Sequence, residues 1–476
     1  MTAPDFFVDV QGGARVCLPP TLSNITTYVL LEQETWFEDE LDFVRVCLGP
    51  GDCAVDVGAN FGVFTTAMAA AVGGGGSVLA FEPAASTAAF LRETLSANGL
   101  TQVQAVQAAL SDRPGSALLE IGDSPELNAL AEAPQAGREA ERVELLRLDD
   151  VMRRHGGMQL SLIKIDAEGH ELQVSKGAQR TLLAHEPLVL FEIKHGPSVE
   201  YRLLDFLQTL GFEAYRLLPG PGVLVPHRRD MPLDDFQLNL FGCTPGRARA
   251  LNAAGLLALP GAAPAAETAD SREARDYLQT LPGPAPAAGS ADAHAQALLH
   301  YALSQTPAAT PEEKAAQLGQ ALRLARRACS EEASLARLLT LTALAAGAGE
   351  RRAAVDTLAT LKGMVDVGHA QLSEPCLPPH PRYAALPWRE SPVEWVECAV
   401  VESFERLCAF SSVFQGPAAL PSLEYLRSKR FYCAQMERRR QLLRMRSGRQ
   451  PGPQPHPLLI DTAPDNLNPW FWSAGQ

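Results

Sequence analysis

The sequence predicts an α/β domain with a mostly parallel sheet, followed by an all-α domain. Three observations indicate this order. Residues 53–57 form an apolar segment of strand length that ends in a glycine-containing turn and leads into apolar residues at helical spacing. Further apolar strand-length segments then alternate with helical patterns up to about residue 244. Beyond a stretch rich in Ala, Pro and Gly, only helical patterns recur.

The composition is that of a globular protein with enough residues for two or three domains. The chain has 476 residues, of which 46% are hydrophobic and 20% are charged. A net charge of -14 argues against general affinity for nucleic acid or anionic membranes. No apolar run is long enough for a transmembrane segment, and the first residues lack the pattern of a secretion signal, so we expect a cytoplasmic protein. The nine cysteines include no C-x-x-C pair, which favours buried thiols over disulfides or a zinc site.

The segment before the first strand is expected to support the α/β domain. Residues 1–33 combine short apolar alternations with a Pro-Pro break and predict a small N-terminal cap. Residues 36–48 carry apolar side chains along one face, which indicates an amphipathic helix beside the first strand. Phe37 and Glu38 are placed either to reach a bound ligand or to serve packing and solvent contact.

The turn after the first strand predicts a ligand site. It reads D-V-G-A-N-F-G from Asp56 to Gly62, so a carboxylate ends the strand and glycines flank the start of a helix. The free N–H groups of that helix point back toward the strand end. Dinucleotide-binding domains use G-x-G-x-x-G, and a carboxylate at this place would repel a diphosphate, so a nicotinamide oxidoreductase is disfavoured. A carboxylate suits a cationic ligand instead.

Two further strand ends carry acidic residues. Residues 77–82 form an apolar strand that ends in Glu82, at the distance from the glycine turn where an acid accepts hydrogen bonds from ribose hydroxyls. Residues 84–98 are predicted to be helical, and residues 103–110 a third strand. Asp112 follows, placed either to accept a hydrogen bond from an adenine amino group or to serve an ordinary turn in S-D-R-P-G.

The next segment predicts a second, smaller set of strands. Strands are expected over 117–121 and 143–148, joined by a polar loop that we interpret as a substrate lid, and a short helix is expected from Asp149. The fourth main strand ends in I-K-I-D-A-E-G-H-E, after which a helix continues through Leu182. Five ionisable groups crowd this strand end, an unfavourable arrangement unless cations, hydrogen bonds or a ligand balance it. They are Lys164, Asp166, Glu168, His170 and Glu171.

The last part of the α/β domain contains another strand that ends in ionisable residues. Residues 188–193 form a fifth strand with Glu192 and His195 at its end. Glu168 and Glu171 lie at the start of the helix expected after the fourth strand, where they are as well placed to cap that helix as to act in catalysis. A helix and two adjacent strands that form a terminal β-hairpin are expected over residues 199–210, 212–217 and 237–241.

These motifs, in this order, resemble the FkbM family of S-adenosylmethionine-dependent methyltransferases over about residues 34–244. The motifs that carry the resemblance are D-V-G-A-N-F-G-V-F-T, F-E-P, A-A-L-S-D, L-D-D-V, I-K-I-D-A-E-G-H-E and F-E-I. The resemblance implies a class I methyltransferase fold, which is Rossmann-like with a seven-stranded, mostly parallel sheet. It also implies S-adenosyl-L-methionine as cofactor and O-methylation of a hydroxyl on a sugar, glycan or secondary metabolite.

The resemblance also implies cofactor-binding residues. It places Asp56, Gly58, Asn60 and Gly62 around the amino-acid part of the cofactor, Glu82 at the ribose and Asp112 near the adenine. In-line methyl transfer needs an aligned acceptor hydroxyl, which a positioned base assists. Asp166 is our first candidate for that base or orienting group, followed by Glu192 and His195, with His170 as a further possibility. Clustered carboxylates permit a divalent ion, but no spacing requires one, so we expect no metal.

The second half of the chain predicts a linker, a helical domain and a tail. Residues 245–292 are rich in Ala, Pro and Gly, residues 293–446 are helical, and residues 447–476 form an extended tail. The helices fit either tetratricopeptide-like hairpins or a plain bundle. They are expected over 294–305, 311–329, 331–346, 351–364, 393–410 and 422–445.

The last of these helices is strongly basic, and we expect its face to be solvated or paired within the chain rather than to bind an anionic partner. The helical domain offers a surface for a protein partner or for self-association. A rival function follows from it: an interaction scaffold whose methyltransferase half binds cofactor with little or no turnover.

Overall fold

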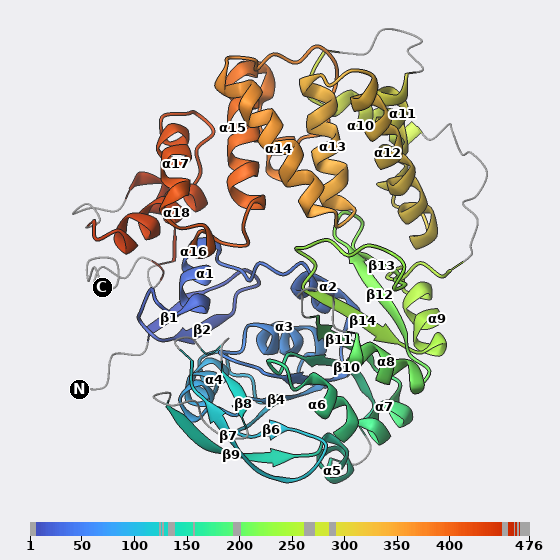
Figure 1. The fold of residues 1–476 in the computed structure, drawn as a ribbon, viewed down its shortest axis with the longest axis vertical. Coiled ribbons are helices and arrows are strands. Elements are labelled where there is room, and N and C mark those ends of the chain that lie inside the picture. The colour runs from blue at the N-terminus through green and yellow to red at the C-terminus, as the bar shows by residue number, and fades with distance from the viewer. Residues whose placement is uncertain are drawn as a thin grey trace. The chain divides into compact units, whose positions relative to one another are not determined.

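The structure is a computed structural model with two compact units (Figure 1). One unit, here the sheet unit, combines Met1–Tyr215, Leu238–Ala250 and Arg444–Gln476. The other, here the helical unit, combines Arg216–Gln237 and Leu251–Leu443. The structure describes residues 6–122, 125, 128–131, 139–155, 158–193, 201–260, 272–284, 292–449, 456–460, 462–463 and 466.

The main sheet has eight strands in the order β13-β12-β14-β11-β10-β3-β4-β5. The central strands are parallel, because β10 pairs in parallel with both β3 and β11, and β4 pairs in parallel with β3 and β5. Strand β14 is antiparallel to both of its neighbours, β11 and β12. The strands are β3 (Cys53–Val57), β4 (Ser77–Phe81), β5 (Val103–Val106), β10 (Leu160–Ile165), β11 (Leu188–Glu192), β12 (Glu213–Leu218), β13 (Val223–Pro226) and β14 (Asn239–Cys243).

Burial explains why the central segments form strands. Every residue of β3 and β10 is buried, and such continuous apolar runs are typical of parallel strands covered on both faces. Helix α3 packs on β3 and β4, and α4 packs on β5. The helices of this part of the chain are α1 (Ile25–Gln33), α2 (Glu40–Cys47), α3 (Val63–Val72), α4 (Ala85–Ala97), α5 (Leu148–Arg154), α6 (Glu171–Gly177), α7 (Gln179–His185), α8 (Arg202–Thr209) and α9 (Pro245–Ala253).

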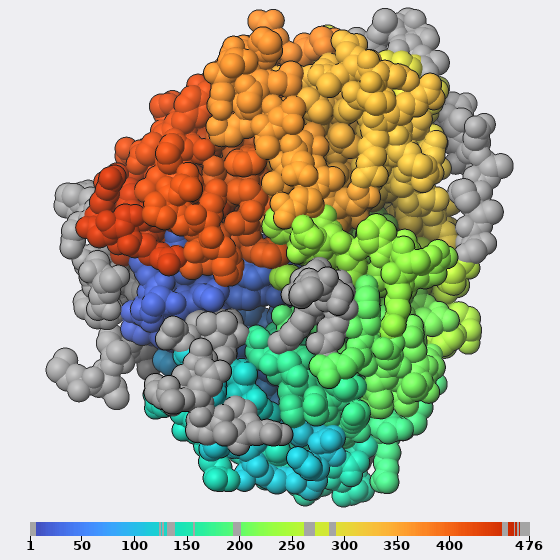
Figure 2. Space-filling view, in the orientation of Figure 1, coloured from blue at the N-terminus to red at the C-terminus, as the bar shows by residue number. Residues whose placement is uncertain are grey.

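Two small sheets accompany the main one. The N-terminal cap is a hairpin of β1 (Phe6–Asp9) and β2 (Arg15–Leu18). A four-stranded sheet has the order β6-β9-β7-β8, and its strands lie in the cyan to teal part of Figure 2. They are β6 (Ala109–Leu110), β7 (Gly115–Glu120), β8 (Ala129–Ala131) and β9 (Ala140–Leu146).

The predicted fold class is confirmed, with three corrections to the predicted strands and helices. The main sheet has eight strands rather than seven, because the chain between β12 and β14 forms the additional edge strand β13. The expected third strand is divided into β5 and β6, since β6 leaves the main sheet and pairs with β9. The expected helix after β10 is divided into α6 and α7. A Cβ at Gly177, where α6 ends, would lie 1.9 Å from the carbonyl oxygen of Ser111.

The helical unit packs its helices in chain order. Each of the helices from α10 to α15 contacts the next one, and α15 also contacts α17. Helix α12 begins with a complete capping box, in which Thr310 and Glu313 exchange side-chain and backbone hydrogen bonds. The helices are α10 (Arg272–Thr280), α11 (Ala293–Ser304), α12 (Pro311–Glu331), α13 (Leu335–Gly347), α14 (Arg351–Asp366), α15 (Pro392–Leu407), α16 (Ser412–Gln415), α17 (Leu420–Arg427) and α18 (Ala434–Arg446), the last shared between the units.

The prediction of one basic helix over 422–445 is wrong. The segment forms α17 and α18, separated by a turn in which Phe431 and Tyr432 are buried. Tyr432 donates a hydrogen bond to Glu437 at 2.9 Å, which fixes the start of α18 against the turn. The expected pairing within the chain occurs: Arg440 contacts Glu437 and Glu424 at 2.9 and 2.8 Å.

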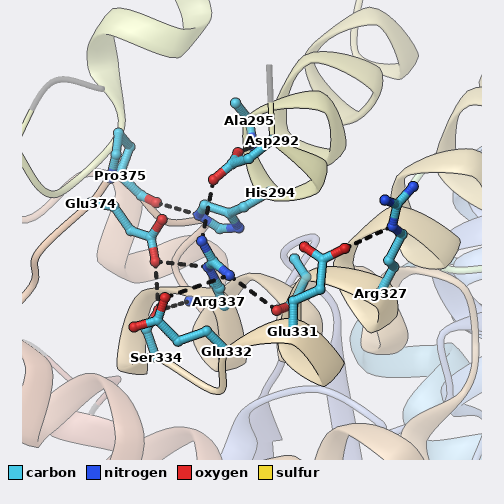
Figure 3. A network of polar contacts seen from close by, with 11 residues as sticks. Asp292, His294, Ala295, Arg327, Glu331, Glu332, Ser334, Arg337, Glu374 and Pro375 are labelled. Carbon is cyan, nitrogen blue, oxygen red and sulfur yellow. Dashed lines mark hydrogen bonds and ion pairs between the residues drawn. The ribbon is translucent and has the colours of Figure 1, made fainter. Parts of the chain in front are cut away.

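A partly buried arginine joins three segments of the helical unit (Figure 3). The side chain of Arg337 in α13 is 11% exposed and forms ion pairs with Asp292 at 3.2 Å and Glu374 at 3.1 Å. It also donates to the backbone carbonyl of Ala328 at 3.1 Å. Nearby, Nε2 of the buried His294 lies 2.8 Å from the carbonyl oxygen of Pro375. The segment at 374–375 is thereby held to α11 and α13.

Among the helices that the structure describes, none combines the length and the hydrophobicity that crossing a bilayer requires.

Candidate functional site

A cavity lies at the carboxyl ends of β3, β4 and β10. It is open to solvent, and its empty space, including the solvent at its mouth, measures about 1000 Å³. Ligands of open α/β sheets bind in this position, outside the carboxyl ends of the strands. Its described lining residues are Thr26, Trp36, Glu38, Val57, Gly58, Ala59, Asn60, Phe61, Val63, Phe64, Phe81, Glu82, Pro83, Ala108, Ala109, Leu110, Leu119, Pro125, Asn128, Leu130, Lys164, Asp166, Ala167, Glu168 and His170.

Asp56 lies beneath the cavity and is not one of its lining residues. Its side chain is fully buried, and Oδ2 accepts a hydrogen bond from Oγ1 of Thr65 in α3 at 2.6 Å. Nζ of Lys164 lies 4.0 Å from Oδ1. Burial raises the pKa of Asp56, and Lys164 opposes this effect. The carboxylate therefore fixes the base of the site through Thr65 and Lys164.

The glycine turn approaches the end of β10 closely. Gly58 has a φ of +77°, and a Cβ at this position would lie 1.9 Å from the carbonyl oxygen of Asp166. Only glycine allows this approach. Asn60 also has a positive φ, of 50°. Gly62 has a φ of +94° and precedes α3, but it is not one of the lining residues, unlike Gly58 and Asn60.

The N–H groups of Gly58, Ala59 and Asn60 in the turn form hydrogen bonds within the protein. Gly58 and Ala59 both donate to the carbonyl oxygen of Phe81, at 3.0 and 2.9 Å. Asn60 donates to Oε2 of Glu82 at 3.0 Å. The turn is therefore rigidly joined to the end of β4.

Glu82 lines the cavity and is 6% exposed. Its Oε2 accepts from the N–H of Asn60, and Oε1 accepts from the N–H of Ala84 at 3.0 Å. Burial raises the pKa of Glu82 to about 7, and these two backbone donors act in the opposite direction. Each carboxylate oxygen retains a second lone pair that a ligand can use.

Lys164 is the central cation of the site. It is 4% exposed, and Nζ donates to Oδ2 of Asp166 at 2.9 Å. The ammonium also lies 4.9 Å from the centre of the Phe64 ring. Burial opposes the charged form, but the carboxylates of Asp166, Asp56 and Glu38 raise the pKa of Lys164 overall. The side chain is therefore charged and Asp166 is paired. The crowding at this strand end indicated a site, but the central role of Lys164 was missed.

Glu38 lines the cavity and is held by two residues that the sequence did not reveal as part of the site, Trp36, which also lines it, and Asn239, which is not one of its described lining residues. Oε1 of Glu38 accepts from the indole N–H of Trp36, and Oε2 accepts from the amide of Asn239, both at 2.8 Å. Burial raises the pKa of Glu38, and Lys164 lowers it. Phe37 stacks on Trp36 with ring centres 4.4 Å apart and is absent from the described lining. Of the two roles considered for these residues, contact with a ligand therefore fits Glu38, which faces the site, and packing fits Phe37.

His170 lines the cavity, whereas Asp112 does not. Nε2 of His170 lies 2.9 Å from Oγ of Ser111, and burial lowers the pKa of this histidine. Asp112 is exposed, so the structure does not bring it to the cavity. Glu171 accepts from the N–H of Gly169 at 2.8 Å, so it orders the turn before α6, and the expected capping is not seen because the N-cap residue His170 makes no side-chain capping hydrogen bond.

Three carboxylates near the cavity could hold a cation. The ligand atoms of Asp166, Glu168 and Glu192 lie within 4.8 Å of one another. Lys164 already pairs with Asp166, so this arrangement does not require a metal. Asp166 and Glu168 line the cavity, and Glu192 is not one of the described lining residues. His195 and most of the predicted lid loop lie outside the described residues.

Comparisons with known proteins agree with the motifs. The family model described as Methyltransferase FkbM domain matches residues 56–214. "Methyltransferase sdnD" of Sordaria araneosa is 31% identical over 192 residues, covering 34% of this chain and 74% of that relative.

Similar solved structures were also found. Methyltransferase FkbM from Methylobacillus flagellatus has 18% identity and a TM-score of 0.28, over 40% of this chain and 43% of that one. A SAM-dependent O-methyltransferase from Thermotoga maritima has 14% identity and a TM-score of 0.26, over 51% and 78%. At such low scores the superpositions add nothing to the strand order described above.

Proposed function

This chain belongs to the FkbM family of methyltransferases, and we propose that it transfers a methyl group from S-adenosylmethionine to a hydroxyl of a sugar, glycan or secondary metabolite. One observation carries this proposal. The glycine turn after β3, Glu82 after β4 and the Lys164–Asp166 pair of β10 all meet at one cavity. The three strands are neighbours in the sheet, so their carboxyl ends form one edge.

The cavity suits the proposed cofactor. Glu82 offers lone pairs to ribose hydroxyls while it remains bonded to the backbone of Asn60 and Ala84. Apolar side chains suited to an adenine ring lie on another part of the lining, at Ala108, Ala109, Leu110, Leu119 and Leu130. We therefore assign the ribose to Glu82 and the amino-acid part to the turn of Gly58 and Asn60. Asp56 and Gly62 would support that turn from outside the cavity. Asp112 keeps its proposed adenine role only if ligand binding moves it.

The residues around Asp166 would align the acceptor. When bound, S-adenosylmethionine would supply a methyl group on a sulfonium, which is a good electrophile. The acceptor oxygen would attack in line with the carbon–sulfur bond, so its position decides the rate. Lys164 holds one oxygen of Asp166, which leaves the other to orient the acceptor hydroxyl or accept its proton. Glu192, His195 and His170 are the further candidates for this proton.

Calorimetric titration tests the cofactor proposal. We expect S-adenosylmethionine and S-adenosylhomocysteine to bind the intact chain with one-to-one stoichiometry. Glu82→Ala should weaken both ligands, because it removes the carboxylate proposed to bind the ribose. Glu93→Ala is the matched control, since Glu93 is an exposed glutamate of the neighbouring helix α4.

Absence of binding to the folded wild-type protein would contradict the proposal and favour the scaffold function. Saturable binding would justify an acceptor screen with hydroxyl-bearing glycans and secondary metabolites, followed by mass spectrometry for a gain of one methyl group. Asp166→Asn should lose turnover in that screen while it retains cofactor binding.

A further inference from the structure

Lys164 stands out among the charged residues of the cavity. Among the described lining residues it is the only lysine or arginine, whereas Glu38, Glu82, Asp166 and Glu168 are acidic. Its ammonium contacts Asp166 at 2.9 Å and lies 4.0 Å from Asp56. One positive charge therefore stands between a carboxylate on the wall and a carboxylate beneath it.

This pair lies beside the glycine turn. Lys164 and Asp56 are in register on the adjacent strands β10 and β3. The backbone of Gly58 approaches the carbonyl of Asp166 so closely that no Cβ fits between them. Lys164 and Asp166 are two residues apart in an extended segment, so their side chains point to the same face. The ion pair is therefore next to the part of the cavity assigned above to the amino-acid portion of the cofactor.

The proposed reaction gives this charge a particular meaning. A methyl donor with a sulfonium carries a positive charge that disappears as the methyl group leaves. A site that binds this charge strongly stabilises the bound donor more than the transition state, which raises the barrier. Unpaired carboxylates in a buried site would bind the charge in this way. A fixed cation beside these carboxylates would weaken their binding of the sulfonium charge.

We propose that Lys164 is a specificity-determining residue that offsets part of the carboxylate charge of the site, so that the affinities for donor and demethylated product differ less than the carboxylates alone would make them. The inference rests on the proposed function. In this role the side chain need not touch the acceptor or take part in proton transfer. It sets how strongly the cavity distinguishes a sulfonium from a neutral thioether of nearly the same shape.

A purely structural role for Lys164 predicts something different. If Lys164 only stabilised the buried Asp56, its loss would loosen the site and weaken both ligands equally. The ratio of the two dissociation constants separates these possibilities, because S-adenosylmethionine and S-adenosylhomocysteine differ only in the methyl group and its charge. General damage to the site cancels in this ratio.

The experiment is calorimetric titration of the full chain at pH 8.5 with both ligands. In Lys164→Met, the ratio of the S-adenosylhomocysteine Kd to the S-adenosylmethionine Kd should rise about tenfold, the size of one unit-charge interaction across a partly buried site. Lys164→Arg should keep the wild-type ratio. Lys176→Met is the matched control, because Lys176 is an exposed lysine in the helix that follows the same strand.

In Lys164→Met, Asp56 could take up a proton and lose the negative charge whose effect is to be measured. A second comparison removes this possibility. In an Asp56→Asn background this residue can no longer gain a proton, so adding Lys164→Met must again raise the ratio about tenfold. A ratio within about twofold of its parent in both backgrounds would overturn the inference, provided that S-adenosylhomocysteine still binds. Failure of the wild type to bind either ligand would instead overturn the proposed function.

Discussion

Two cations of this protein, the partly buried Arg337 and the buried Lys164, face carboxylates in different ways. Arg337 in the helical unit uses separate nitrogens for Asp292, Glu374 and the carbonyl of Ala328, all within 3.2 Å. Lys164 in the sheet unit has one short contact, to Asp166, and a second carboxylate at 4.0 Å. Lys164 also lines a cavity. The comparison teaches that a cation with a full set of partners holds segments together, whereas one with a short contact and an open side can respond to a ligand.

The largest expected effect is the loss of stability on removing the Arg337 side chain from its ion pairs. Arg337→Met should lower the free energy of unfolding by about 3 kcal/mol, because it removes the partner of Asp292 and Glu374, whose side chains are 38% and 22% exposed and therefore partly screened by solvent. Urea denaturation would measure this loss. The matched control is Arg327→Met, which removes an exposed pair with Glu331 and should cost less than about 1 kcal/mol. Equal losses in the two variants would contradict the distinction.

The next effect concerns Glu82 and pH. The pKa of Glu82 is raised by burial to about 7 in the folded protein, from 4.5. Between these values the folded state binds the extra proton, so stability falls as pH rises. The free energy of unfolding of wild type minus that of Glu82→Gln should therefore drop by about 3 kcal/mol from pH 4.5 to pH 7. Denaturant titrations at several pH values would measure it, and a flat difference would show that Glu82 has the same pKa in the folded and unfolded chain.

A smaller effect is expected on cofactor affinity. Ribose hydroxyls donate to an ionised carboxylate, so binding should favour loss of the Glu82 proton. Affinity for S-adenosylhomocysteine should rise roughly tenfold between pH 6 and pH 8, since one pKa unit corresponds to a factor of ten. Calorimetry across this range would measure the rise, and Glu82→Gln should abolish it. A rise that persists in Glu82→Gln would assign the titration to another group.

The smallest effect separates local capping from long-range ion pairing in the helical unit. Thr310→Ala removes the capping box of α12 and should cost about 1 kcal/mol. Thr360 is an exposed threonine within α14, so Thr360→Ala should cost nothing and can even stabilise that helix. Thermal unfolding of both variants would measure the difference. A cost for Thr310→Ala as large as that for Arg337→Met would mean that capping and ion pairing are not separable here.

Local patterns in the sequence predicted the strands well, because the central segments are mostly apolar and end in recognisable turns. The same patterns placed Glu82 and Asp166 at the cavity. They did not predict that β6 leaves the main sheet, since its partner β9 is more than 30 residues away and its apolar run continues from β5. The break between α17 and α18 was missed because the aromatic residues of the turn fit a helical pattern and are buried by tertiary contacts.

The details of the site depended on contacts between distant segments. Asp56 was expected to contact the cofactor, but the structure places it under the cavity, bonded to Thr65 and near Lys164. Asn239 meets Glu38 across 201 positions of the chain, and nothing in either local sequence indicates this pair. Sequence patterns thus located the site, while the charge arrangement within it required the fold.

The contact between Glu38 and Asn239 bears on how the protein matures. Asn239 belongs to β14, which is inserted between β11 and β12 although it is the last strand of the main sheet to be synthesised. When the residues of β12 have just left the ribosome, the nascent chain still lacks β14 and the Asn239 amide that holds Glu38. The glycine turn is by then long complete. The hydrogen bond from Asn239 to Glu38 can therefore form only after every other strand of the main sheet has been synthesised.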